Sequence, residues 1–299
     1  MAIKSVKFSL NGQTYDLTYD SASNSYKATI TAPGTTSWNE TNHKYAGSVV
    51  AEDTAGNKTT ATTADFDTLG LRVLEKVKPV ISVTYPTAGA YIANSKPTFR
   101  WTVTDADSGI NSATISIKLD SGNAITDGIT KKSITNGYSC EYTPSVALSE
   151  GTHTVTINVS DNDGNAATAA SVSFTVDTVP PVLNVTAPTE GYVTNKAALV
   201  VSGTTNDATS SPVTVKVTVG AGAAQTATVN EDGSFSVSVT LANGANAIKI
   251  VATDAAGKTT TVTRNVTLDT AAPVISAITL TPNPVDAGAT YIVSVTVTD

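Results

Sequence analysis

Residues that can face a core alternate with polar residues over short runs along most of the chain. Three such runs precede a loop aspartate, and they contain Phe99, Trp101 and Val103, then Val201, Gly203 and Thr205, then Val293, Val295 and Val297. A period of two indicates a β-strand with one buried face. Shorter runs of the same kind recur between them, and no helical period is readable. The pattern predicts an all-β protein.

The predicted strands recur in units that have the size of an immunoglobulin-like sandwich. Three segments open alike and reach an aspartate after the same interval: Pro79-Val80-Ile81 with Asp105, Pro181-Val182-Leu183 with Asp207, and Pro273-Val274-Ile275 with Asp299. We therefore expect domains at 79–178 and 179–270. Residues 271–299 hold only the first strands of a fourth unit, which either continues in a longer chain or is completed by another subunit.

Residues 1–78 are expected to form a shorter immunoglobulin-like domain. Asn11-Gly12 separates two alternating runs, which predicts a tight hairpin. The late turn Asp53-Thr54-Ala55-Gly56-Asn57 recurs in the next two units, and the stretch from Leu69 to Val73 is expected to be the last strand. The predicted architecture is therefore a row of tandem immunoglobulin-like β-sandwich domains arranged end to end.

Composition and charge narrow the possible functions. The net charge is −7 and no run of basic residues occurs, so the chain lacks the electrostatic signature of a nucleic-acid-binding protein. No apolar stretch is long enough for membrane insertion. The single cysteine, Cys140, excludes an internal disulfide. The N-terminus has no apolar signal region, so we expect synthesis in the cytoplasm without a signal peptide, although an internal fragment with an added Met would look the same.

Two motifs recur at the joints and late turns of these units. They are Asp177-Thr178-Val179-Pro180-Pro181-Val182 with Asp269-Thr270-Ala271-Ala272-Pro273-Val274, and Asp53-Thr54-Ala55-Gly56-Asn57 with Asp254-Ala255-Ala256-Gly257. Over residues 45–299 the chain resembles bacterial immunoglobulin-like (Big-type) tandem repeat proteins. Such repeats serve as stalks on adhesins, surface enzymes and virions alike, so the resemblance implies the fold more than the function. The opening, Met1 to Tyr19, resembles immunoglobulin-like proteins of phage and prophage structural gene clusters.

Acidic loops are the main candidate binding site. In a sandwich of this type the B–C and F–G loops share one pole, so Asp105 and Asp107 could converge with Asp161 and Asp163. Hard oxygen ligands suit Ca²⁺, which would stiffen the joint with the preceding domain. The alternative is that each aspartate caps its own turn. Isolated aspartates at the same positions of the next unit favour this alternative.

Catalysis has little support in the sequence. Cys140 and His153 could face one another as a nucleophilic pair, but no orienting group is implied, and a single strand cysteine is usually a small buried hydrophobic residue. Trp101 lies in an alternating run and is expected in a core. Trp38 lies in a polar loop, where it either binds a sugar or protein partner or folds back over a small core. No catalytic or cofactor-binding residue is predicted, with calcium as the only candidate ligand ion.

The sequence leads to a non-enzymatic structural or adhesion protein. The first hypothesis is a phage virion or phage-tail-like component, with domains used as spacer and surface-binding modules. The alternatives are a stalk fragment of a bacterial cell-surface adhesin and an accessory carbohydrate-binding array of a secreted enzyme. The expected partners are other virion or surface proteins and cell-surface glycans, and the question of a homo-oligomer is left open.

Overall fold

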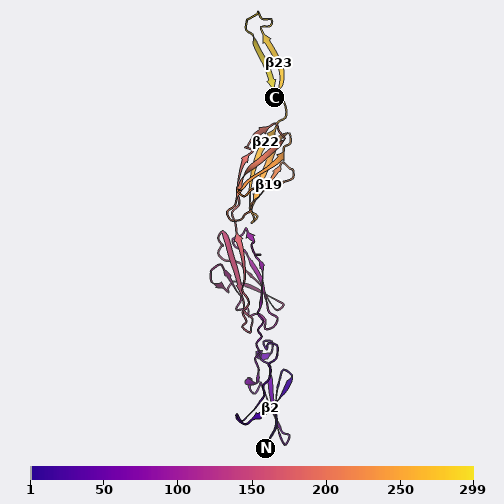
Figure 1. Ribbon diagram of the computed structural model, residues 1–299, viewed down its shortest axis with the longest axis vertical. Helices are drawn as coiled ribbons and strands as arrows, with labels where there is room; N and C mark the ends of the chain where they lie inside the picture. The colour runs from indigo at the N-terminus through magenta and orange to yellow at the C-terminus, as the bar shows by residue number, and fades with distance from the viewer. Residues whose placement is uncertain (1) are drawn as a thin grey trace. The chain divides into compact units, whose positions relative to one another are not determined.

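The computed structural model describes residues 2–299, which are almost entirely β-strands joined by turns and loops. By their internal contacts the residues group into two compact units, one ending at Val176 and the other running from Asp177 to Asp299. Figure 1 shows the strands of each unit, coloured by residue number. Within residues 2–299, no helix has the length and apolar character needed to cross a membrane. The expected all-β fold of tandem immunoglobulin-like domains is confirmed.

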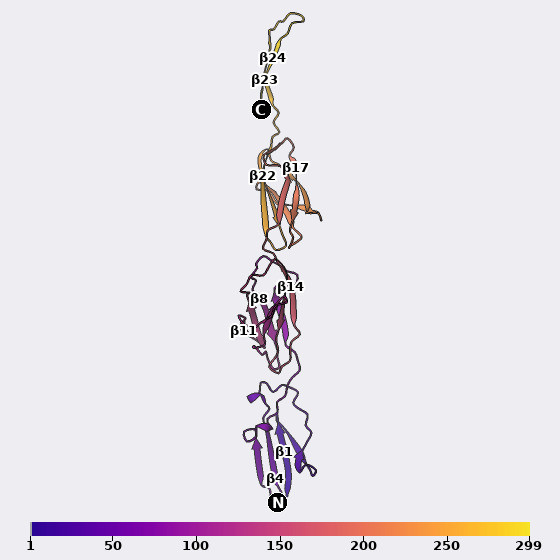
Figure 2. The ribbon, with the colours of Figure 1, turned by 90° about the vertical axis from the view of Figure 1, so that its left-hand side faces the viewer.

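The first domain is one five-stranded antiparallel sheet with the order β3-β2-β1-β4-β5. Its strands are β1 (Ile3–Leu10), β2 (Gln13–Asp20), β3 (Ser25–Lys27), β4 (Gly47–Asp53) and β5 (Lys58–Thr62), of which β1 and β4 are labelled in Figure 2. The hairpin predicted at Asn11-Gly12 is confirmed, because Leu10 pairs with Gln13 and both turn residues have positive φ. Long loops, rather than a second sheet, pack beside these strands.

The strand expected between Leu69 and Val73 is absent from this domain. Asp65 accepts the N–H and the hydroxyl of Thr62, which turns the chain away from β5. A 3₁₀ turn (Asp67–Leu69) follows, and Leu71 then makes only an isolated bridge with Tyr45. Val73 bonds to Ser37, a loop residue, instead of to a strand, so this prediction was wrong.

The second domain is a sandwich of two sheets, β10-β9-β13-β14-β7 and β11-β12-β8-β6. The strands are β6 (Val80–Tyr85), β7 (Tyr91–Ile92), β8 (Phe99–Thr104), β9 (Ser116–Leu119), β10 (Ala124–Ile125), β11 (Thr130–Ile134), β12 (Gly137–Tyr142), β13 (Gly151–Asn158) and β14 (Ala170–Val176). Phe99, Trp101 and Val103 of β8 are buried, which confirms Trp101 as a core residue. Phe174 of β14 packs edge-on against Phe99 across the sandwich.

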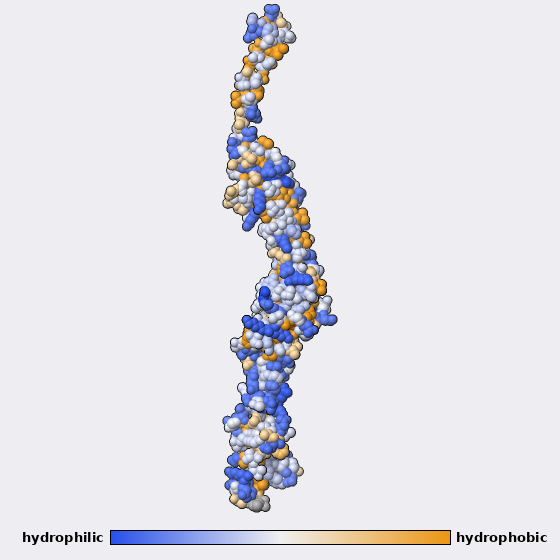
Figure 3. Space-filling view, turned by 180° about the vertical axis from the view of Figure 1, so that it is seen from behind, coloured by the Kyte–Doolittle hydropathy of each residue, from blue (hydrophilic) through white to orange (hydrophobic). Residues whose placement is uncertain are grey.

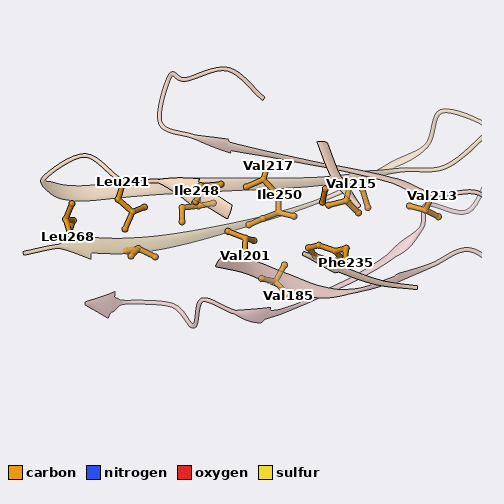
Figure 4. Close-up of a cluster of buried hydrophobic side chains, with 14 residues drawn as sticks. Val185, Val201, Val213, Val215, Val217, Phe235, Leu241, Ile248, Ile250 and Leu268 are labelled. Atoms are coloured by element: carbon orange, nitrogen blue, oxygen red, sulfur yellow. The ribbon is translucent and has the colours of Figure 1, made fainter. Parts of the chain in front are cut away.

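The third domain repeats this plan with the strand order β15-β17-β20-β19-β18-β21-β22-β16. The strands are β15 (Val182–Ala187), β16 (Tyr192–Thr194), β17 (Ala198–Asn206), β18 (Thr214–Val219), β19 (Gln225–Val229), β20 (Ser234–Thr240), β21 (Gly244–Thr253) and β22 (Thr259–Leu268). Strand β19 pairs with β20 at one end and β18 at the other, which links the two faces. Figure 4 shows the core between them, where Val201 and Phe235 oppose Val215 and Ile250.

The last described segment is a single hairpin of β23 (Val274–Thr281) and β24 (Ile292–Thr298). Its register shifts between Ile275 and Ala277, closer to the opening proline than the shifts between Val83 and Tyr85 and between Val185 and Ala187 in the two sandwiches. Val293 corresponds to the buried Val201 but is 54% exposed. At the top of Figure 3, apolar side chains accordingly appear on the surface of this hairpin.

Candidate functional site

Three carboxylates converge where the chain enters the second domain. Glu75 precedes β6, Asp105 directly follows β8, and Asp161 lies in the turn after β13. One oxygen of each lies within 4.8 Å of the other two, and Asp105 and Asp161 are buried. We call these three residues the first acidic cluster.

Neighbouring N–H groups donate hydrogen bonds to the carboxylate oxygens of the first acidic cluster. The amide of Asn165 donates to Asp161 Oδ2 at 2.8 Å and to Glu75 Oε1 at 3.0 Å. Backbone N–H groups of Asp107 and Gly109 donate to Asp105 Oδ1 at 3.1 and 2.9 Å. A single asparagine side chain thus links two of the three carboxylates.

The surroundings of Glu75 shift its pKa. Burial raises the pKa of Glu75, and the adjacent Asp161 carboxylate raises it further, while hydrogen bonds from Val77 and Ser108 oppose the change. Two close carboxylates disfavour ionisation of one of them. Negative charge at this position is therefore costly unless a proton, a cation or a donor lies between the groups.

The predicted set Asp105, Asp107, Asp161 and Asp163 is only partly brought together. Asp107 is exposed, and its carbonyl accepts the amide of Asn39 at 3.0 Å. Asp163 turns toward the first domain, where its Oδ2 accepts the Thr36 hydroxyl at 2.5 Å and the Glu75 N–H at 3.1 Å. Glu75 takes the place of these two residues in the cluster, and no sequence motif had singled it out.

A second acidic cluster occupies the equivalent place in the third domain. Asp177 precedes β15, Asp207 directly follows β17, and Asp254 follows β21. One oxygen of each lies within 4.8 Å of the others, and Asp177 and Asp254 are buried. The sequence suggested isolated aspartates in this domain. Asp177 was missed as the third member, although the repeated Asp-Thr at the joints offered the signal.

Hydrogen-bond donors reach the carboxylates of the second acidic cluster but leave one buried oxygen unpaired. Asp177 accepts the hydroxyl of the buried Ser210, and Asp207 Oδ1 accepts the N–H groups of Thr209 and Ser210 at 2.8 Å. Asp254 Oδ1 accepts the N–H of Lys258 at 2.8 Å. Its other oxygen, Oδ2, is buried without a hydrogen-bond partner.

Cys140 and His153 do not form a pair. Cys140 lies on β12 opposite Trp101, in one sheet, whereas His153 lies on β13 in the other. Burial raises the pKa of the Cys140 thiol to about 11, so it is a poor nucleophile. His153 bonds Asp120 Oδ2 through Nδ1 at 2.8 Å and the carbonyl of Ser149 through Nε2 at 2.9 Å. Both ring nitrogens therefore serve local structure.

Trp38 is half-buried in the loop that approaches the second domain. His43 stacks on its indole ring with the centroids 3.8 Å apart, so one face of the indole is covered. The adjacent Asn39 reaches the carbonyl of Asp107 at 3.0 Å, and the hydroxyl of Thr36 donates to Asp163. The loop that carries Trp38 thus makes polar contacts with the second domain.

Known proteins resemble parts of this chain. Residues 87–178 match the family model described as bacterial Ig-like domain, and residues 181–270 match glucodextranase, domain B. A stretch of 133 residues is 33% identical to bacillopeptidase F of Bacillus subtilis (strain 168), covering 44% of this chain and 9% of that protein. The chain therefore spans about a tenth of the length of this relative.

Solved structures of tandem modules are also similar. Fibronectin(III)-like modules of Clostridium thermocellum CbhA match with a TM-score of 0.42 and 14% identity, over 64% of this chain and 94% of that chain. A titin structure matches with a TM-score of 0.40 and 13% identity, over 87% of this chain and 85% of that chain. The family models thus show that the second domain is similar to bacterial Ig-like domains and that the third domain is similar to domain B of glucodextranase.

Proposed function

We propose that this chain is a non-enzymatic structural and adhesion protein whose immunoglobulin-like domains act as spacers and surface-binding modules. The observation that carries this proposal is the polar docking of the first domain on the second. Thr36 and Asn39 bond to the loops that contain Asp163 and Asp107, and the linker residue Glu75 bonds to Ser108 and Asn165. A spacer needs consecutive domains held by such direct contacts instead of a free linker.

The environments of the two potentially reactive side chains support a structural role. Cys140 is enclosed in the core of the second domain, and both nitrogens of His153 are engaged by neighbours. A nucleophile needs an adjacent base that is free to take its proton. Neither residue meets this requirement.

The proposed setting is a phage virion or phage-tail-like particle. The support is the resemblance of residues 1–19 to proteins of phage structural gene clusters. In this setting the partners are other virion proteins and glycans of the host surface. A stalk fragment of a cell-surface adhesin is an alternative that uses the same domains in the same way.

A second candidate is an accessory region of a larger secreted enzyme. Two observations favour it: residues 181–270 match a domain named after glucodextranase, and 133 residues match part of bacillopeptidase F. In this setting the array connects or positions a catalytic part that the present chain does not contain. Trp38 would then be the residue to examine for glycan contact, through the face of its indole that His43 does not cover.

Localisation of the native protein tests these settings. An antibody raised against the purified chain is applied to gradient-purified phage particles, cell envelopes and culture supernatant of the source bacterium. The virion proposal expects the signal to co-sediment with particles. A signal confined to the envelope would contradict it in favour of an adhesin, and a signal confined to a larger secreted polypeptide would favour the accessory region.

A glycan array tests the surface-binding part separately. The intact chain and the Trp38→Ala variant are compared, with Trp101→Phe as a variant altered only in a core. Binding that is lost in Trp38→Ala alone supports a glycan site on this loop. Equal binding by all three chains, or none by any, would contradict it.

A further inference from the structure

The buried oxygen Asp254 Oδ2 lacks a hydrogen-bond partner, and comparison of the three domains explains why. In the late turn of the first domain, Asn57 Nδ2 donates to Asp53 Oδ2 at 2.9 Å. In the second domain Asn165 Nδ2 donates to Asp161 Oδ2 at 2.8 Å. The third domain has Lys258 at this position, and its backbone N–H reaches only Asp254 Oδ1. The donor used in the other two turns is missing.

The position of Asp254 makes this deficit severe. The residue is 6% exposed, and Asp177 beside it is 0% exposed. A buried carboxylate with one unpaired oxygen is destabilising, and two neighbouring carboxylates add repulsion. Among residues 2–299, no Lys, Arg or His side chain forms an ion pair with Asp177, Asp207 or Asp254. Within the described residues, these three carboxylates therefore have no directly paired counter-charge.

We propose that the second acidic cluster, Asp177, Asp207 and Asp254, binds a divalent cation of the calcium class. Three carboxylate oxygens within 4.8 Å of one another supply the hard anionic ligands that such an ion prefers, and a cation neutralises the buried charge. Asp254 Oδ2 is the oxygen that gains a partner. All three residues belong to the second compact unit, so the site is complete within it.

The first acidic cluster differs because the oxygen equivalent to Asp254 Oδ2, which is Asp161 Oδ2, has a side-chain donor. There Asn165 donates to both Asp161 and Glu75, so the amide occupies the position between two carboxylates. The inference is therefore confined to the third domain. It adds a ligand to the proposed spacer and does not depend on the setting in which the array is used.

The cation would fix the beginning of the third domain. Asp177 lies ahead of β15, while Asp207 and Asp254 lie on loops that follow β17 and β21. An ion held by all three residues ties the entering segment to two loops of the sandwich. We expect this to raise the unfolding temperature of the third domain.

Calcium titration of the intact chain tests the site. Isothermal calorimetry with calcium chloride is expected to give a Kd on the order of 10⁻⁴–10⁻³ M, the range of extracellular calcium modules. Differential scanning calorimetry is expected to show a rise of several degrees in the unfolding temperature when calcium replaces chelator. Sodium chloride at the same ionic strength controls for screening.

Variants locate the binding residues. Asp254→Asn is expected to abolish the calcium response and to unfold in chelator at the same or a higher temperature than the parent, because it removes an uncompensated buried charge. Asp53→Asn, the matched change in the exposed turn of the first domain, should keep the full response. Lys258→Met should also keep it, since the ammonium is not the partner of Asp254.

Three results would overturn the site. One is the absence of any response up to about 10 mM calcium, which lies beyond the affinity range of such modules. Another is an unchanged response in Asp254→Asn. The third is a marked fall in the chelator unfolding temperature of Lys258→Met, which would identify the lysine ammonium as the counter-charge.

Discussion

Individual residues decide how closely strands and loops approach in this protein. Gly203 of β17 has no side chain, and an added Cβ would lie 2.1 Å from the carbonyl oxygen of Asn184 and 2.9 Å from the ring of Phe235. The sequence presented Gly203 as one position of an alternating run. Glycine is required there because two neighbouring strands approach closely. The alternating pattern does not show which strands will be neighbours.

We predict that Gly203→Ala destabilises the third domain by about 2 kcal/mol or more, since backbone and core must both shift. Gly34→Ala is the matched control, because a Cβ there meets nothing within 4 Å and its φ is not positive. This variant should change stability by about 0.5 kcal/mol or less. Urea unfolding of both variants measures the difference, and equal stabilities would contradict the packing described.

His153 should make the stability of the second domain depend on pH. Burial alone would lower its pKa, but the Asp120 carboxylate and the Ser149 carbonyl outweigh burial, so the pKa is raised above 6.5. The folded state therefore binds this proton more tightly than the unfolded state. The stabilisation is fully present below pH 6.5 and is lost as the pH rises through the folded pKa.

Urea unfolding at several pH values between 5 and 9 measures this effect, in the parent and in Asp120→Asn. The parent should lose more stability than the variant over this range, because the amide cannot hold the protonated imidazole. Parallel pH profiles of the two proteins would contradict the role given to the pair.

At the scale of elements, one turn is used three times with different partners. The turns after β4, β13 and β21 each start with an aspartate that accepts a backbone N–H from the residue four positions later. The repetition was legible in the sequence, because it requires only local capping. The partners of each turn come from distant strands and linkers, which is why Glu75 and Asp177 were not predicted.

We predict that Asn165→Ala destabilises the second domain by about 1–3 kcal/mol. The change removes the side-chain donor to the buried Asp161 Oδ2 and one of the donors to Glu75 Oε1, which keeps the Ser108 hydroxyl. Asn57→Ala removes the matching side chain from an exposed turn, where it bonds only Asp53, and should cost about 1 kcal/mol or less. Thermal unfolding of the two variants compares the sites, and a larger loss in Asn57→Ala would be inconsistent with the first acidic cluster.

At the scale of the whole molecule, the fold was largely predictable and the sites were not. The period-two alternation around Trp101 and Val201 predicts strands with one buried face. The similar openings at Pro79 and Pro181 predict repeated units of the size of a sandwich domain. The first domain departs from this plan, because its 3₁₀ turn and loops replace a second sheet. Loop contacts such as Thr36 with Asp163 depend on how two domains meet, which no local pattern encodes.

The second and third domains each have a hydrophobic core of their own, and the proposed spacer role requires each of them to resist extension separately. Single-molecule force spectroscopy of the intact chain tests it most directly. We predict separate unfolding events for the second and third domains, each lengthening the chain by roughly 30 nm at about 3.6 Å per residue. A single event that releases both domains together, or extension without discrete events, would contradict it.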